Sequence, residues 1–129
     1  VNIVALMDSA DGKVLSCEPK IQLMMSSAYV RKMSEQLLKI NPTALIAVFA
    51  RPITANLPLV SEVFHKARCW DPNKILGSVA LEVMRIEAMA ARLFHLNPEF
   101  LSIPVVGGAD ASTAVPLISK AKPLNHISQ

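Results

Sequence analysis

Two side chains that could act together in chemistry, Glu82 and Arg85, lie three residues apart in the sequence. Residues at this spacing are neighbours on one face of a helix, so the carboxylate and the guanidinium would meet there. An arginine can hold a substrate carboxylate through two parallel hydrogen bonds. The plainer alternative is an ion pair in solvent. The spacing alone leaves both interpretations open.

Three further residues could contribute to a binding site. Gly107 and Gly108 follow a β-branched run and indicate a tight turn. Arg51 directly follows the apolar run 44–50, which has the length of a buried strand. It could bind an anion at the carboxyl edge of a sheet, where open α/β sheets place their ligands. Alternatively, it is a strand-end arginine that faces solvent.

The remaining reactive side chains suggest no site. We expect His65, His95 and His126 at helix ends or in the tail to be surface residues. Cys17 and Cys69 are far apart, and reduced structural thiols are the default for such a pair. No cluster with metal-ligand spacing occurs, so we predict no metal site.

The composition is typical of a small folded domain and argues against a membrane-spanning or nucleic-acid-binding protein. The 129 residues are 52% hydrophobic with a net charge of +3, which fits a folded chain of about one small domain. No apolar run approaches the roughly 18–20 residues that a membrane span needs. Lys and Arg are dispersed without interleaved aromatic residues, so we predict no nucleic-acid partner. The chain begins inside an apolar run without an initiator Met, which we take to indicate a piece of a longer protein.

The first part of the chain predicts a βαβ unit. Apolar runs at 2–7 and 44–50 are typical of buried strands, and a loop is expected over 8–19. Between them, 20–40 has the apolar spacing of an amphipathic helix, which Asn41-Pro42 ends. A strand, a crossover helix and a second strand favour a parallel sheet and an α/β fold.

The rest of the chain predicts mainly helices. A helix capped by Asn56 is expected to run to about residue 67, followed by a turn over 73–77. A long helix is predicted over 79–95 and a strand over 101–106. The last predicted element is a helical segment over 112–121.

Three stretches carry a family resemblance: Asp-Pro-Asn-Lys at 71–74, Leu-Glu-Val-Met-Arg at 81–85 and Ile-Pro-Val-Val-Gly-Gly at 103–108. They resemble malate dehydrogenases of the mitochondrial and bacterial type, in the lactate/malate dehydrogenase family. The resemblance implies the second half of a Rossmann-like, parallel-sheet dinucleotide domain over 1–52. It further implies the first part of the malate dehydrogenase catalytic domain over 53–129.

The resemblance also assigns roles to site residues. It places Arg85 at the substrate-carboxylate arginine and Glu82 at the aspartate that orients the catalytic histidine. Ala109 stands where the family has that histidine, and Arg51 stands where it has an asparagine that contacts cofactor ribose and substrate. The family's mobile lid with its two arginines would fall on 8–21, where this sequence has Lys13 and Lys20.

The function that the resemblance implies is NAD-dependent interconversion of malate and oxaloacetate in the tricarboxylic acid cycle of the mitochondrion. The phosphate-binding Gly-x-Gly-x-x-Gly does not occur in these 129 residues. With Ala109 at the histidine position, we expect a pseudoenzyme that retains the fold, with a homodimer or another protein as partner. Three alternatives stay open: residual or altered malate dehydrogenase activity on a small dicarboxylate, a non-catalytic interaction subunit, and a fragment without a function of its own.

Overall fold

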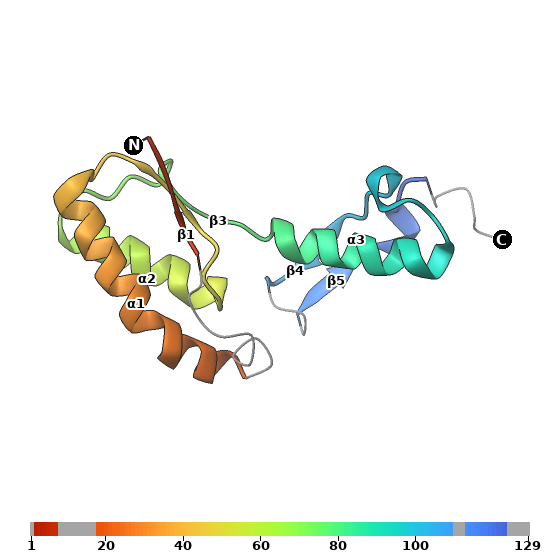
Figure 1. Ribbon diagram of the computed structural model, residues 1–129, viewed down its shortest axis with the longest axis horizontal. Helices are drawn as coiled ribbons and strands as arrows, with labels where there is room; N and C mark the ends of the chain where they lie inside the picture. Colours follow the sequence, from red (N-terminus) through yellow and green to blue (C-terminus); the bar gives the residue numbers. More distant parts are fainter. Residues whose placement is uncertain (1, 8–17, 110–112, 124–129) are drawn as a thin grey trace. The chain divides into compact units, whose positions relative to one another are not determined.

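The computed structural model of this protein describes residues 2–7, 18–109 and 113–123. The chain forms two compact units, Val1–Ser78 and Val79–Gln129, which are coloured from red to green and from green to blue in Figure 1. The fold is α/β with a parallel sheet in the first unit, as the sequence predicts.

The sheet of the first unit has three strands in the order β1-β2-β3: β1 (Ile3–Leu6), β2 (Leu45–Val48) and β3 (Ile75–Gly77). Both neighbouring pairs are parallel. Helix α1 (Pro19–Ile40) lies between β1 and β2 in sequence, and α2 (Ile53–Lys66) lies between β2 and β3. The predicted βαβ unit is therefore confirmed. Because all three strands run the same way, their carboxyl ends lie at one edge of the sheet.

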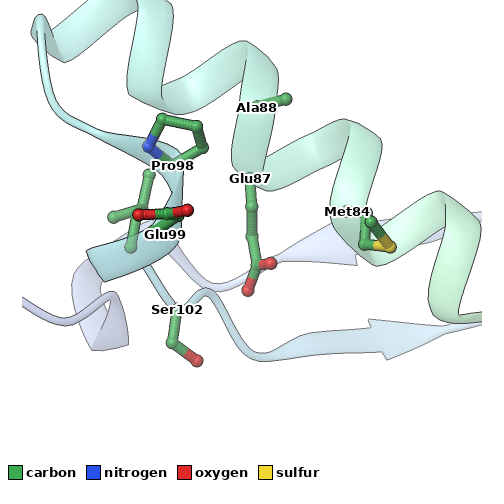
Figure 2. A pocket seen from close by; sticks show the side chains of 7 residues that line it. Met84, Glu87, Ala88, Pro98, Glu99 and Ser102 are labelled. Atoms are coloured by element: carbon green, nitrogen blue, oxygen red, sulfur yellow. The ribbon is translucent and has the colours of Figure 1, made fainter.

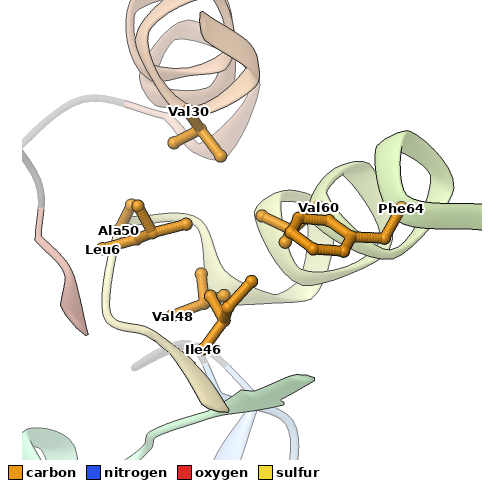
Figure 3. Close-up of a cluster of buried hydrophobic side chains, with 7 residues drawn as sticks. All are labelled: Leu6, Val30, Ile46, Val48, Ala50, Val60 and Phe64. Atoms are coloured by element: carbon orange, nitrogen blue, oxygen red, sulfur yellow. The ribbon is translucent and has the colours of Figure 1, made fainter. Parts of the chain in front are cut away.

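Both helices pack on the same face of this sheet, and their apolar side chains form the core shown in Figure 3. Alternate strand residues point to this face because the side-chain period of a strand is two. Full burial of one such side chain contributes about 1.5–3 kcal/mol. The buried cluster consists of Leu6, Val30, Ile46, Val48, Ala50, Val60 and Phe64.

The opposite face of the sheet is also apolar. Its side chains are paired by the strand register and belong to Ile3, Ala5, Leu45, Ala47 and Leu76. Ile3 is 65% exposed and Leu76 is 42% exposed. Parallel sheets are normally covered on both faces, so these exposed side chains form a surface suited to burial. We call these five residues the open sheet face.

The second unit is built on helix α3 (Ala80–Phe94), which ends at His95 in the left-handed conformation with φ 53°. A short 3₁₀ turn, η2 (Pro98–Phe100), follows. Strands β4 (Val105–Gly107) and β5 (Ala114–Pro116) then pair antiparallel, and η3 (Ile118–Lys120) comes after them. The small core of this unit contains Ala90, Ala91, Leu101, Ile103 and Ala121.

Two predicted boundaries in the first unit are wrong. The segment 73–77 is not only a turn, because Ile75–Gly77 is strand β3, whose pairing with β2 outweighs its short length. Helix α2 begins at Ile53 after Pro52, not after an Asn56 cap. No side chain caps the helix, and the Asn56 amide is buried inside it, where it donates to Ser26 Oγ and to the Arg51 carbonyl.

Two predictions in the second unit also need correction. The strand predicted over 101–106 is confined to Val105–Gly107, because only these residues find a continuous partner in β5. The helical segment predicted over 112–121 is wrong for the described residues, which form β5 and the 3₁₀ turn η3. Pro116 helps to explain this, since proline disfavours a helix interior. Ser112 and the loop residues 8–17 lie outside the described part of the chain.

Along the chain, the boundary between the two compact units falls between Ser78 and Val79, so α2 and β3 belong to the first unit. The assignment of 1–52 and 53–129 to two domains of the resembled family concerns homology, and it stays a prediction.

Candidate functional site

Arg51 lies three residues beyond the end of β2, at the carboxyl edge of the parallel sheet. Its backbone is held by two neighbours. The Arg51 carbonyl oxygen accepts hydrogen bonds from Ser26 Oγ and from Asn56 Nδ2, each at 2.9 Å. The side chain is half-buried. Residue 51 is therefore fixed at the edge where open α/β sheets place ligands.

Asn56 also lies at this edge, inside α2 and not at the helix cap that its sequence position predicts. It is fully buried, and its Nδ2 also donates to Ser26 Oγ at 3.0 Å. Its Oδ1 is buried and has no hydrogen-bond partner in the described part of the chain. The available signal was the position of Asn56 between Ala55 and Leu57 near the helix start, since a polar side chain that is buried among apolar ones needs hydrogen-bond partners.

Glu82 and Arg85 do meet on α3, with Glu82 Oε1 3.2 Å from Arg85 Nη1. The Arg85 side chain is 46% exposed and that of Glu82 is 18% exposed. Exposed pairs at this helical spacing contribute only a few tenths of a kcal/mol. The pair therefore leaves the guanidinium accessible, while one of its nitrogens is turned to Glu82. The predicted contact between Glu82 and Arg85 is confirmed, whereas their predicted roles in catalysis and substrate binding stay predictions.

Ala109 follows the β4 strand end, where Gly107 has φ +94°. Gly108 N–H donates to the Thr113 carbonyl at 3.2 Å, which closes the β4–β5 hairpin. A side chain on Gly107 would collide with the Thr113 carbonyl oxygen, so the predicted tight turn requires glycine here. Ala109 itself is half-buried and carries only a methyl group, which cannot exchange a proton.

The histidines lie where the sequence places them, as far as they are described. His65 is exposed near the end of α2, and His95 is exposed at the end of α3. The His65 ring packs edge-on against Trp70, with ring centroids 6.1 Å apart. His126, Lys13 and Cys17 lie outside the described residues, whereas Cys69 is a free, exposed thiol.

An open groove of about 560 Å³ lies between α3 and the segment after it (Figure 2). Most of its lining is apolar, and Glu87 reaches from α3 toward the chain that leads to β4. There Glu87 Oε1 accepts the backbone N–H of Ile103 at 3.0 Å. The groove is lined by Met84, Glu87, Ala88, Pro98, Glu99, Leu101 and Ser102.

The described residues contain neither a candidate metal site nor a candidate membrane-spanning helix. Over 2–7, 18–109 and 113–123, no group of three His, Cys, Asp or Glu residues could hold a metal ion. No helix in the same ranges combines the length and the apolar character that crossing a membrane requires.

Comparison with known proteins gives consistent sequence relatives. The chain is 35% identical over 99 residues to peroxisomal malate dehydrogenase 1 of Arabidopsis thaliana, an alignment that covers 77% of this chain and 28% of the relative. It is 31% identical over 105 residues to malate dehydrogenase of Idiomarina loihiensis, which covers 81% and 34%. Mitochondrial malate dehydrogenase of Sus scrofa is 39% identical over 82 residues, covering 64% and 24%. No protein-family profile matches the chain.

Solved structures agree on the fold. A lactate dehydrogenase from Cryptosporidium parvum, in complex with lactic acid and nicotinamide adenine dinucleotide, matches with a TM-score of 0.77 at 20% identity. That match covers 94% of this chain and 37% of the other. The apo malate dehydrogenase of Picrophilus torridus matches with a TM-score of 0.72 at 18% identity, covering 98% and 39%.

The homologues of this chain are thus malate dehydrogenases, and its fold is that of part of a lactate or malate dehydrogenase. The chain spans about a third or less of the length of the curated relatives it matches.

Proposed function

We propose that this homologue of malate dehydrogenases is a malate dehydrogenase-like protein whose NAD-dependent interconversion of malate and oxaloacetate is impaired. One observation carries the proposal: the residue directly after Gly107-Gly108 is Ala109. In the resembled family this position holds the histidine that takes the hydroxyl proton as the hydride leaves. A methyl group cannot accept a proton, and general-base help contributes about 10²–10⁴-fold to such steps.

Arg85 is the residue proposed to bind substrate. Its guanidinium is partly exposed on α3 and can hold a carboxylate of a small dicarboxylate through two hydrogen bonds. Glu82 reduces this capacity, because its Oε1 lies 3.2 Å from Arg85 Nη1 and competes with the substrate for that nitrogen. Glutamate is also one methylene longer than the family's aspartate, so it would displace an imidazole next to it.

NAD, when bound, supplies the acceptor for the hydride. The residues of this chain could contact only a part of the NAD molecule. Arg51 at the carboxyl edge of β2 offers donors for ribose or phosphate oxygens, since a guanidinium can only donate. Its carbonyl is already engaged by Ser26 and Asn56. No glycine-rich phosphate loop occurs in these 129 residues, so the pyrophosphate would have to be held elsewhere.

The experiment measures oxaloacetate reduction by NADH, using the full natural protein that contains this sequence. We expect a kcat/KM at least about 10²-fold below that of an active malate dehydrogenase measured in parallel. Oxaloacetate binding is measured alongside by calorimetry for Arg85→Ala and for Arg92→Ala, a control arginine exposed on the same helix. Binding should weaken only in Arg85→Ala. Robust turnover by the unsubstituted protein would show that another residue serves as the base.

A second candidate function, a non-catalytic interaction subunit, is favoured by the open sheet face with its exposed Ile3 and Leu76. A protein of this kind would form a homodimer or a complex with another protein while failing to bind NADH. Equilibrium sedimentation, combined with NADH titration, distinguishes it from the impaired enzyme.

The compartment and the pathway are part of the same proposal. A mitochondrial protein of the tricarboxylic acid cycle is one prediction, but the relatives include peroxisomal as well as mitochondrial and bacterial proteins. Fractionation of the source cells, followed by detection of the protein, decides between these compartments.

A further inference from the structure

A closed triangle of hydrogen bonds surrounds the backbone at position 51. Ser26 Oγ and Asn56 Nδ2 both donate to the Arg51 carbonyl oxygen at 2.9 Å, and Asn56 Nδ2 also donates to Ser26 Oγ at 3.0 Å. Ser26 is 3% exposed and Asn56 is fully buried. The triangle joins three parts of the chain: α1, the turn after β2, and α2. Ser26 lies 25 residues before Arg51 and 30 residues before Asn56 in the sequence.

In the buried side-chain amide of Asn56, only the nitrogen makes hydrogen bonds to other described residues. Its Nδ2 makes two hydrogen bonds, while its Oδ1 is buried without a partner in the described residues. An unsatisfied buried acceptor costs about 1–3 kcal/mol. An apolar side chain of similar shape would avoid this cost. The contribution of Asn56 therefore lies in the two donor contacts that it makes to the Ser26–Arg51 pair.

These contacts act at a place where a ligand can bind. The Arg51 carbonyl, at the carboxyl edge of the sheet, is held by Ser26 of α1 and by Asn56 of α2. Fixing the carbonyl fixes the peptide plane that contains the Arg51 Cα, and so it restricts the position from which the Arg51 side chain starts.

We propose that Ser26 and Asn56 are positioning residues that aim the side chain at position 51 toward the ligand edge of the sheet. The part of this inference that concerns a ligand rests on the proposed function. Because a guanidinium only donates hydrogen bonds, the ligand group that it meets is an oxygen acceptor, and an anionic phosphate or carboxylate suits it best. Ser26 and Asn56 touch no ligand themselves and act through Arg51.

The test compares two buried serines of the same helix. Ser26→Ala removes a contact of the triangle. Ser34→Ala is the matched control, because Ser34 is fully buried and its Oγ donates only within α1, to the Val30 carbonyl at 2.8 Å. Asn56→Ala serves as a second variant of the triangle. Each variant is made in the full natural protein, and circular dichroism confirms that it is folded.

NADH binding is measured by fluorescence titration in the Arg51 protein and in the Arg51→Ala background. Loss of one hydrogen bond typically changes an equilibrium by a few-fold to about ten-fold, so we expect Ser26→Ala to weaken NADH binding by about 3- to 10-fold. In the Arg51→Ala background the same change should have no further effect. Ser34→Ala should stay within about two-fold in both backgrounds, as independent sites do. Equal shifts for Ser26→Ala and Ser34→Ala would overturn the inference.

A ligand-free measurement separates this inference from the proposed function. The motion of Arg51 Nε is followed by nitrogen-15 NMR relaxation, and it should increase in Ser26→Ala and Asn56→Ala but not in Ser34→Ala. If the unsubstituted protein binds no NADH and this pattern is found, cofactor binding is wrong and the positioning role stands. An Nε signal that is unchanged in both triangle variants would overturn the positioning role, whatever the result with NADH.

Discussion

The carboxylate of Glu87 accepts a hydrogen bond from the backbone N–H of Ile103, with Oε1 3.0 Å from the nitrogen. The contact joins the middle of α3 to the segment before β4, 16 residues further along the chain. Ile103 is almost fully buried, so its N–H has little access to water. Glu87 is thus a structural residue of the second unit.

The first prediction concerns this contact. Glu87→Ala leaves the Ile103 N–H without its acceptor and should lower the free energy of unfolding by about 1–3 kcal/mol. Glu87→Gln keeps an acceptor oxygen and should cost less. Glu99→Ala is the control, since Glu99 lines the same groove but is exposed. Urea unfolding of the full natural protein measures the three changes, and equal losses for Glu87→Ala and Glu99→Ala would contradict the structural role.

The second prediction concerns the β4–β5 hairpin. Gly107→Ala should destabilise the protein by about 1–3 kcal/mol, because φ +94° is strained for any residue with a side chain. The added Cβ would also meet the backbone carbonyl of Thr113, which cannot move without opening the hairpin. In Gly77→Ala the new Cβ meets Ile53 Cγ2 at 2.8 Å, a side-chain atom that can shift. Thermal unfolding should therefore show the larger loss for Gly107→Ala.

The third prediction concerns the open sheet face. The isolated 129 residues should be aggregation-prone or molten, because exposed apolar faces and unpaired strand edges associate. Leu76→Lys places a charge on this face and should increase the soluble fraction. Met24→Lys adds the same charge at an exposed position of α1 and should help less. Sedimentation and dye binding report the result, and cooperative thermal unfolding of a soluble, unsubstituted monomer would refute the prediction.

The fourth prediction concerns catalysis. Ala109→His alone should recover little oxaloacetate reduction, since Glu82 would crowd the imidazole and Arg51 would stand in place of an asparagine. The combined change of Ala109→His, Glu82→Asp and Arg51→Asn should recover more than the product of the single effects, because catalytic groups act as a unit. The measurement is kcat/KM for oxaloacetate in the full natural protein. Simple multiplication of the three single effects would argue against a shared site.

Some of this protein could be predicted from local sequence. Apolar runs at 2–7 and 44–50 with a helix between them predicted the parallel β1–β2 pair, because such a pattern is stable only when helices cover the sheet. The three-residue spacing of Glu82 and Arg85 predicted their contact, since helix geometry alone brings them together. The motifs around Arg85 and Gly107-Gly108 pointed to the malate dehydrogenases, which the comparisons confirm as homologues.

Other features were decided only by tertiary structure. Ile75–Gly77 is a strand because β2 offers it a partner, and residues 114–116 are a strand because β4 does so. Asn56 has the sequence features of a helix cap, yet its amide serves Ser26 and Arg51, which come from other elements. Likewise, the Glu87 carboxylate finds Ile103 across a loop. In each case the deciding partner is distant along the chain, and local spacing holds no information about a contact that forms only when separate elements pack.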